Sequence, residues 1–590
     1  MDRRVIGAAA AVAVVLALLA AFPVADGAFG LTDRGAAESS TWFRNATDEA
    51  GFHYLGTQKA TSIRGTVATD DGVYVADVNN DLREDVLAVG GEEPVLYVNT
   101  GDGFERSSAL PDVPAEVYVR AALFFDADGD GWEDLVLLRH GEPPVLLENE
   151  RGTFERREDA FDRSLSVPIG ASAADYDGDG CTDLFVVQNG NWDDVRPARL
   201  TNDMAAMERG NGNPNVLFRG TCGSDTGEEP AFEAVDDAGI SGDHWSLAAS
   251  FVDLTGDGRP DIHVANDFNN DVIYVNEGDG TFERREIPET NRNGMSSEVG
   301  DVNGDLRPDI FVTNINWTKK AQASAGVSMY KVEDHMGNNL LINRGNGTFV
   351  DRAKPYGVEA GRWGWAAVYA DLDNDGDRDL FHTTRGKFYE DPPFFVDLGK
   401  LYDFKQARFF ERVEEDRFEA RVTPDLGFTE ELDGRGVARL DYDGDGRLDL
   451  AVADTSHPFA LFANQRDGGN ALQLFVADDG GAAANGARVY VTVDGAERLY
   501  MVHARADYLS QDSRLVHVGL GDHERVDEIR VEWTDGSTTV LEDVDANRRL
   551  VVTDDGMTAA CPFEGERGPI RSLLSGDCGF AFDDGNWSRA

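Results

Sequence analysis

An acidic nonapeptide of the form D-x-[DNT]-x-D-x-x-x-D occurs seven times in this chain. The copies, numbered loops 1 to 7, begin at Asp77, Asp126, Asp175, Asp253, Asp301, Asp371 and Asp441. A short apolar run precedes each copy and another follows it, as residues 73–75 and 86–89 do around loop 1. Short runs rich in β-branched and aromatic residues are typical of buried strands. Each copy therefore predicts a hairpin of two strands with an acidic loop between them.

A second hairpin signal follows the first in several copies. The apolar run 95–99 ends at Asn99, and Gly101 and Gly103 come next; the pattern recurs at 276–282 and 343–349. Glycine and asparagine are expected to supply the positive φ angles of such turns. Four strands per repeat, with a period of about 40–50 residues, indicate the blades of a β-propeller.

The spacing of the loops predicts where the ring carries extra chain. The loop starts are 49, 49, 78, 48, 70 and 70 residues apart, so three intervals hold a bare blade and three carry insertions. The insertions fall around residues 188–213, 314–336 and 386–408, and we expect them to leave from one face of the ring. Trp42 and Phe43 are expected to supply the outer strand that closes the ring between the last blade and the first.

The loops suit calcium. Carboxylates at alternate positions can aim several oxygens at one point, and calcium takes 6–8 oxygen ligands, whereas zinc would require histidine or cysteine. An EF-hand loop would end in a glutamate at position twelve, but Ala88 and Leu137 stand there in loops 1 and 2. The expected ligands are the side chains at positions one, three, five and nine and the carbonyl oxygen at position seven.

The residues at these positions differ between the loops. They are Asp77, Asn79, Asp81, Arg83 and Asp85 in loop 1; Asp126, Asp128, Asp130, Trp132 and Asp134 in loop 2; Asp175, Asp177, Asp179, Cys181 and Asp183 in loop 3; Asp253, Thr255, Asp257, Arg259 and Asp261 in loop 4; Asp301, Asn303, Asp305, Arg307 and Asp309 in loop 5; Asp371, Asp373, Asp375, Asp377 and Asp379 in loop 6; and Asp441, Asp443, Asp445, Arg447 and Asp449 in loop 7. Loops 1, 4 and 5 lack a carboxylate at position three, and Leu82 and Leu306 replace the usual glycine at position six. We expect these three loops to bind more weakly. The sequence thus predicts up to seven calcium ions, mainly structural, with magnesium or sodium as the alternative in weak loops.

These loops resemble the FG-GAP or VCBS calcium repeats of integrin α-chain propellers. Farther along, GARV at 486–489, YLSQ at 508–511, VGLG at 518–521, VEW at 531–533, DG at 535–536 and Asn547 resemble the ASPIC/UnbV domain. The two together resemble the cartilage acidic protein (CRTAC) family across residues 40–555. The chain departs from the family pattern at Ala506 and Asp507, where glycines are usual, and at Thr534, where proline is common.

The resemblance implies an all-β fold. We expect a seven-bladed integrin-α-like propeller at residues 38–466, a small β-rich ASPIC/UnbV domain at 467–555 and a cysteine-containing tail at 556–590. The resemblance also implies a role in adhesion, with the ASPIC/UnbV domain as a docking module.

Composition limits the partners. The chain has 109 acidic and 54 basic residues, a formal charge of −55, which argues against nucleic acid and anionic lipid as partners. The side chains at positions one, three, five and nine of the loops account for only 25 of the carboxylates, and eight lysines stand against 46 arginines. A surface that is acidic overall and poor in lysine resembles proteins of extreme halophiles such as haloarchaea, where salt screens the self-repulsion.

The N-terminus indicates export. A basic start, Arg3-Arg4, precedes an apolar run over residues 5–22, so residues 1–30 are expected to be a signal peptide or an N-terminal membrane anchor. Exported chains form disulfides, and we expect Cys181 to pair with Cys222 and Cys561 with Cys578. The protein is expected to be extracellular or on the cell surface.

Three functions remain open from the sequence. The favoured one is a calcium-stabilised protein that adheres to, or interacts with, an extracellular protein or glycan, and that is not an enzyme. The alternatives are a secreted polysaccharide-active enzyme and an envelope assembly or structural protein. The histidines show no metal-site spacing, and no nucleophile motif such as G-x-S-x-G supports an enzyme.

Overall fold

The computed structural model describes residues 41–563 except 57–61, 64–65, 68–70, 91–92, 113–117, 191–211, 223–229, 243, 289, 291–292, 316–336, 385–406, 429–431, 467 and 479–480, together with 580–583 and 586–589. The expected signal or anchor at 1–30 and the residue Cys578 lie outside the described residues. No helix in the described ranges is long and apolar enough to cross a membrane.

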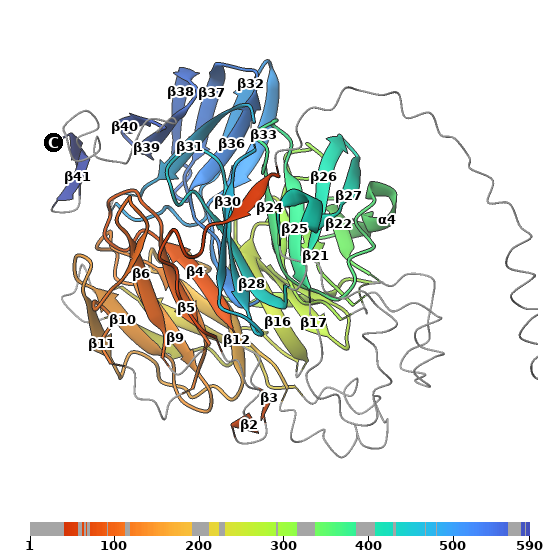
Figure 1. Cartoon of the computed structure of the whole chain (residues 1–590). Helices are drawn as coiled ribbons and strands as arrows, with labels where there is room; N and C mark the ends of the chain where they lie inside the picture. The colour runs from red at the N-terminus through yellow and green to blue at the C-terminus, as the bar shows by residue number, and fades with distance from the viewer. Residues whose placement is uncertain are drawn as a thin grey trace, which may run out of the picture. The chain divides into compact units, whose positions relative to one another are not determined.

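Seven antiparallel four-stranded sheets follow one another along the chain, and each acidic loop joins the first two strands of one sheet (Figure 1). Blade 1 comprises β4 (Gly72–Ala76), β5 (Asp85–Val89), β6 (Val95–Asn99) and β7 (Phe104–Arg106); blade 2, β8 (Val119–Phe125), β9 (Asp134–Arg139), β10 (Val145–Asn149) and β11 (Phe154–Arg157); blade 3, β12 (Pro168–Ala174), β13 (Asp183–Gln188), β14 (Val216–Thr221) and β15 (Ala231–Ala234); and blade 4, β16 (Trp245–Val252), β17 (Asp261–Asp267), β18 (Val272–Asn276) and β19 (Phe282–Glu286).

The later blades repeat this order. Blade 5 comprises β20 (Glu298–Gly300), β21 (Asp309–Val312), β22 (Asn339–Asn343) and β23 (Phe349–Asp351); blade 6, β24 (Gly364–Ala370), β25 (Asp379–Thr384), β26 (Arg408–Glu414) and β27 (Arg417–Arg421); and blade 7, β28 (Gly434–Leu440), β29 (Asp449–Asp454), β30 (Ala460–Asn464) and β1 (Phe43–Asn45). The short elements outside the blades are β2 (Ser62–Ile63), β3 (Thr66–Val67), α4 (Ala353–Tyr356) and the 3-10 turn η3 (Thr423–Leu426).

The first strands of the blades form the inner ring. They are in contact from β4 through β8 and β12 to β16, from β20 through β24 to β28, and from β28 back to β4. Ser250 Oγ, in β16, lies 2.9 Å from the carbonyl oxygen of Ser297, beside β20, and so joins the two arcs. The chain is therefore a seven-bladed β-propeller, as the repeats predicted. Every residue of β8, β12, β16 and β24 is buried, whereas the outer strand β7 exposes two of its three residues.

The N-terminal strand β1 closes the ring. It pairs antiparallel with β30, with Phe43 opposite Asn464, and Figure 1 shows it in red beside the teal strand. Phe43 is fully buried and its ring packs 4.8 Å from that of Phe428. The prediction that the Trp42-Phe43 segment supplies the missing outer strand is confirmed.

The two faces of the propeller carry different connections. The acidic loops join first to second strands and therefore lie on one face, because successive strands of a meander alternate in direction. The three insertions follow the second strands β13, β21 and β25, so each starts and ends on the other face. This topology agrees with the prediction that the insertions leave from one face; the insertions themselves lie almost wholly outside the described residues.

Two further sheets form a C-terminal domain. One has the order β36-β31-β39-β40 and the other β33-β32-β37-β38. The strands are β31 (Asn470–Val476), β32 (Arg488–Val493), β33 (Ala496–Met501), β36 (Val516–Gly521), β37 (Arg525–Glu532), β38 (Thr538–Asp545), β39 (Arg548–Thr553) and β40 (Gly556–Pro562), with a separate hairpin of β41 (Phe580–Asp583) and β42 (Asn586–Arg589). The two sheets share one apolar core, which includes Leu474, Val491 and Val551. Because β40 pairs with β39, the domain continues past the boundary expected at residue 555.

Residues 503–514 of the C-terminal domain, called here the channel segment, lie against the inner ring of the propeller. The segment contains β34 (Ala504–Arg505), which pairs with β12, and β35 (Ser510–Gln511), which pairs in parallel with β4. The Gln511 side chain bonds both backbone groups of Phe124 in β8, accepting from its N–H at 2.8 Å and donating to its carbonyl at 2.9 Å. Blades 1, 2 and 3 thus hold the segment from one side.

Blades 5 and 6 hold the same segment from the other side. The carboxylate of Asp507 accepts hydrogen bonds from the N–H groups of Ser297 at 2.6 Å and Ala367 at 3.2 Å. Asp507 is 5% exposed, so a carboxylate stands at a buried position where the resemblance expects a glycine. The Tyr508 ring packs 4.8 Å from Trp365. The segment therefore occupies the centre of the ring.

Candidate metal sites

The acidic loops share one hydrogen-bond scaffold. In six of them, one carboxylate oxygen of the position-nine aspartate accepts the N–H of position two, at 2.8–3.0 Å, the pairs being Asp85–Val78, Asp134–Ala127, Asp183–Tyr176, Asp261–Leu254, Asp309–Val302 and Asp449–Tyr442. The first aspartate accepts N–H groups from positions four to six; in loop 2, Asp126 accepts from Gly129 at 2.8 Å and Gly131 at 3.0 Å. These bonds curl the loop so that its alternate side chains converge.

The curl requires positive φ angles at positions four and six. Loop 2 places Gly129 and Gly131 there, at φ 77° and 87°. In loops 1 and 5 the sixth position is leucine, yet Leu82 and Leu306 adopt φ 64° and 62°. A branched side chain is strained in this region. Leu82 has a compensating contact, since it packs against the C-terminal core.

Four loops bring three carboxylates together. Oxygen atoms lie within 4.8 Å of one another in the sets Asp126/Asp128/Asp134, Asp175/Asp177/Asp183, Asp371/Asp373/Asp375 and Asp441/Asp443/Asp449. Two oxygens on opposite sides of a calcium ion are about 4.8 Å apart, so the spacing fits a shared ion. The sets belong to loops 2, 3, 6 and 7, which keep aspartate at position three. The corresponding residues of loops 1, 4 and 5 form no such set within the described ranges, and relative affinity stays a prediction.

Loop 6 has the donor set best suited to a cation. It holds five aspartates, and Asp371 Oδ1 and Asp379 Oδ2 are buried without a hydrogen-bond partner among the described residues. The corresponding atoms of Asp126 and Asp134 in loop 2 do have such partners. Buried carboxylate oxygens require a donor or a cation. The residues present at loop 6 therefore fit an oxygen-coordinated ion.

Burial and mutual repulsion raise the pKa of these carboxyl groups. Burial, followed by repulsion from Asp373 and Asp375, holds the pKa of Asp371 well above its ordinary value. Burial raises the pKa of Asp126 to about 8, and repulsion from Asp478 of the C-terminal domain adds to the shift. Burial likewise raises the pKa of Asp183 to about 8. Without a cation, these three carboxyl groups thus favour their protonated forms in the folded protein.

Arginine at position seven changes four of the loops. Arg83, Arg259, Arg307 and Arg447 each form an ion pair with the position-five aspartate of the same loop, Asp81, Asp257, Asp305 and Asp445 respectively. In loop 3, Arg219 of β14 pairs instead with Asp179 at 2.7 Å and with Asp177 at 2.9 Å. The position-five carboxylates are therefore engaged by guanidinium groups in five loops, which the sequence prediction did not anticipate.

An asparagine at the end of the third strand joins each loop to its neighbour in five blades. Asn149 Nδ2 donates to the carbonyl of Glu133 in its own loop, at 3.0 Å, and to that of Val78 in loop 1, at 2.9 Å. The asparagines in this role, called bridging asparagines, are Asn99, Asn149, Asn276, Asn343 and Asn464. Asn99 also takes part in its turn, because its Oδ1 accepts the N–H of Gly101 at 2.9 Å. The positive φ angles come from Gly101 and Gly103 in blade 1 and from Gly345, Asn346 and Gly347 in blade 5, as the prediction for glycine and asparagine stated.

Blade 3 lacks the bridging asparagine and has a disulfide instead. Gly220 occupies the equivalent position, where its N–H donates to Asp183 at 2.8 Å. Two residues later, Cys222 is bonded to Cys181, position seven of loop 3. The predicted Cys181–Cys222 pair is confirmed, whereas the predicted partner of Cys561 lies outside the described residues.

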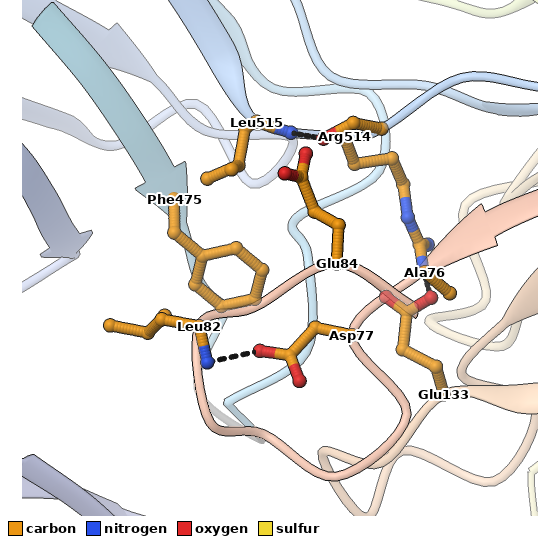
Figure 2. Close-up of a pocket in the computed structure, with 9 residues that line it drawn as sticks. Ala76, Asp77, Leu82, Glu84, Glu133, Phe475, Arg514 and Leu515 are labelled. Atoms are coloured by element: carbon orange, nitrogen blue, oxygen red, sulfur yellow. Dashed lines mark hydrogen bonds and ion pairs between the residues drawn. The ribbon is translucent and has the colours of Figure 1, made fainter. Parts of the chain in front are cut away.

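The C-terminal domain contacts several acidic loops. Arg549 lies 3.3 Å from Asp441 of loop 7, and Gln473 Nε2 donates to the same carboxylate at 2.8 Å. His517 Nε2 lies 2.7 Å from Asn374 Oδ1 of loop 6. Figure 2 shows Leu82 of loop 1 facing Phe475 of the C-terminal domain. The backbone N–H of Leu82 donates to the Asp77 carboxylate. No local sequence signal predicted these contacts, because each joins segments that are far apart in the chain.

Known families match both parts of the chain. The FG-GAP-like repeat family matches residues 77–137, 126–186, 253–312 and 328–382, and the ASPIC and UnbV family matches residues 478–559. The FG-GAP matches contain loops 1 to 6, and the ASPIC and UnbV match contains the channel segment.

Curated relatives extend over both parts. Cartilage acidic protein 1 of Xenopus tropicalis is 25% identical over 507 residues, covering 70% of this chain and 69% of the relative. Cartilage acidic protein 1 of Homo sapiens is 24% identical over 482 residues, covering 70% of this chain and 68% of the relative. A solved structure titled "YCF48 bound to D1 peptide" covers 50% of this chain and 72% of its own, at 9% identity and a TM-score of 0.28, which is too low to carry an argument.

Proposed function

We propose that this chain, an FG-GAP repeat protein with an ASPIC and UnbV domain, is an exported calcium-binding protein of cell-surface adhesion or interaction. It is a homologue of cartilage acidic protein 1 over 70% of its length. The ligand is an extracellular protein or glycan, and the calcium is mainly structural. The protein acts by binding and not by catalysis.

Loop 6 is the observation that carries the calcium assignment. Its buried oxygens on Asp371 and Asp379 have no donor among the described residues, and its carboxylates converge at a distance that suits calcium. Calcium would offset two of the negative charges of the loop's five aspartates and would supply a partner for these oxygens. Asp371, Asp373 and Asp375 would hold it. The bridging asparagines then transmit the fixed loop shape from blade to blade.

The channel segment supports binding over catalysis. An active site at the centre of the ring would need that centre to be open, but Gln511 and Asp507 bond the inner strands there from several sides. The C-terminal domain also contacts the face with the acidic loops. We therefore place the binding site for a partner on the opposite face, from which the three insertions leave. A charge of −55 favours a neutral or cationic ligand on that face.

Two measurements test the proposal. Calcium should raise the melting temperature in molar salt and chelator should lower it; an unchanged melting temperature and no bound metal would refute the calcium assignment. Immobilised protein should retain an envelope protein or glycan with calcium present. Asp371→Asn/Asp373→Asn should retain less of it if the loops shape the binding face. Turnover of a bound polysaccharide would instead favour an enzyme.

A further inference from the structure

Loop 4 balances its negative charge with arginines. Thr255 replaces a carboxylate at position three, which leaves three aspartates in the loop. Arg259 pairs with Asp257 from within the loop, and Arg488 of the C-terminal domain pairs with Asp253. Three carboxylates therefore face two guanidinium groups, whose combined charge equals that of one calcium ion.

The pair between Arg488 and Asp253 is fixed on both sides. Arg488 is the first residue of β32, which is held between β33 and β37. The Asp253 side chain is 8% exposed and that of Arg488 is 30% exposed. Asp253 Oδ2, which contacts Arg488, also accepts the N–H of Gly258 at 2.7 Å. Its other oxygen accepts the N–H of Gly256 at 2.6 Å. Both oxygens of the first carboxylate are thus engaged by donors.

The contrast with loop 6 is direct. There, the first carboxylate keeps a buried oxygen without a partner, and position seven is Asp377 instead of arginine. Loop 7 is intermediate: Arg549 contacts Asp441, yet three carboxylates still converge and Asp443 Oδ1 is buried without a partner in the described ranges. In loop 4, the aspartates form no convergent set among the described residues.

We propose that Arg488 and Arg259 replace a divalent cation in loop 4, and that Arg488 attaches the C-terminal domain to blade 4 without metal. The inference deepens the proposed function and rests on it, since it requires that other loops bind calcium. Loop 4 then keeps its shape in chelator. Arg488 acts as a positioning residue: it holds Asp253 in the orientation that an ion would otherwise impose.

The test uses the full chain with Arg488→Gln, which removes the charge, and Arg488→Lys, which keeps it. The matched control is Arg530→Gln, because Arg530 lies in the same sheet and pairs with Glu497 at 2.9 Å, within its own domain. Bound calcium per chain is measured by elemental analysis after dialysis, and melting temperature is measured in calcium and in chelator.

Arg488→Gln should melt lower than the natural chain in chelator, and calcium should restore much of the loss. It should also bind about one more calcium ion per chain, because the unbalanced carboxylates become available. Arg488→Lys should bind as the natural chain does, and Arg530→Gln should lose the same stability in calcium and in chelator. A double variant, Asp253→Asn/Arg488→Gln, should fold and gain no calcium.

The inference is overturned if Arg488→Gln gains no calcium while the natural chain binds calcium elsewhere. It also fails if the variant does not fold even with calcium present, since an ion should then replace the guanidinium. If the natural chain binds no calcium at all, the proposed function itself is refuted. Elemental analysis of the dialysed natural chain shows this without any variant. The two failures are therefore distinguished by the same measurement.

Discussion

Asn464 Nδ2 lies 2.7 Å from the carbonyl oxygen of Leu372, which joins blade 7 to loop 6 of the neighbouring blade. The same amide group donates to the carbonyl of Leu448 in loop 7, at 3.0 Å. One buried side chain therefore fixes two acidic loops relative to each other. Asn99 does the same between blade 1 and loop 7, across the point where the ring closes.

Replacing Asn464 should destabilise the propeller. Asn464→Ala leaves two buried carbonyls without donors, and we expect a loss of about 1–3 kcal/mol in the free energy of unfolding. The side chain of the adjacent Gln465 bonds exposed groups of Thr41, so Gln465→Ala should cost less than about 0.5 kcal/mol. Denaturant unfolding at fixed salt and calcium compares the two. Equal losses would show that the bridging bond contributes nothing specific.

The loops should differ in their contribution to calcium-dependent stability. Asp371→Asn/Asp373→Asn removes two converging ligands of loop 6, whereas Asp77→Asn/Asp81→Asn changes loop 1, where Arg83 already pairs with Asp81. At a calcium concentration a hundredfold above its dissociation constant, each independent site adds about 2.7 kcal/mol. The loop 6 variant should lose a stabilisation of that order, and the loop 1 variant less. Calorimetric titration of both checks this, and a larger loss at loop 1 would reverse the order of the sites.

Stability without calcium should fall as pH rises from 6.5 to 8. Burial raises the pKa of Asp126 and Asp183 to about 8, so these groups keep their protons in the folded protein below that pH. In the unfolded chain their pKa is about 4, so they lose those protons when the protein unfolds within this pH range. The folded state then binds more protons, and its stability decreases with pH by up to about 1.4 kcal/mol per unit for each such group. In the folded protein, buried histidines such as His263, whose pKa burial lowers to about 3, stay neutral throughout this window. On unfolding their pKa returns to about 6.5, so their proton uptake opposes the trend at the lower end of the window.

Melting curves in chelator between pH 6.5 and 8 measure this effect. Saturating calcium should remove the dependence, because the ion stabilises the ionised carboxylates. A melting temperature that rises with pH in chelator would contradict the raised pKa values.

The disulfide of blade 3 should stabilise the chain where the bridging asparagine is missing. Cys181 and Cys222 are 41 residues apart, and closing a loop of that size contributes about 2–4 kcal/mol. Cys181→Ser/Cys222→Ser should lose this amount. Measured in the same reductant, the natural chain and the double variant should be equally stable, because the reductant also opens the expected Cys561–Cys578 pair in both. If the variant were as stable as the oxidised chain, the disulfide would be energetically neutral.

The repeats allowed much of the fold to be predicted. The acidic nonapeptide and its flanking apolar runs indicated seven blades, one face for the insertions and the closing role of Phe43. Such features recur at a fixed period, so local signals add up along the chain. The sequence also distinguished loops 2, 3, 6 and 7, where three carboxylates converge, from loops 1, 4 and 5, because only the first group has an aspartate at position three.

Other features could not be predicted because they depend on distant segments. Asn99 carries the signal of a turn residue, and its Oδ1 does accept the N–H of Gly101, but nothing nearby in the sequence shows that its Nδ2 reaches loop 7. Arg488 belongs to the GARV motif, but nothing in that motif shows that its side chain reaches loop 4 until β32 is placed beside the loop. The engagement of Asp179 by Arg219 depends on the pairing of two strands separated by an insertion.

The pairing of β1 with β30 has a consequence for the order of assembly. A ribosome makes residues 43–45 before any of the seven acidic loops, but their partner strand ends at residue 464. The first six sheets can form as each emerges, whereas the circle is sealed only when nearly the whole propeller has been made. Pairings over such a long sequence distance form slowly. Until β30 has been synthesised, Phe43 therefore lacks the strand against which it is buried in the folded protein.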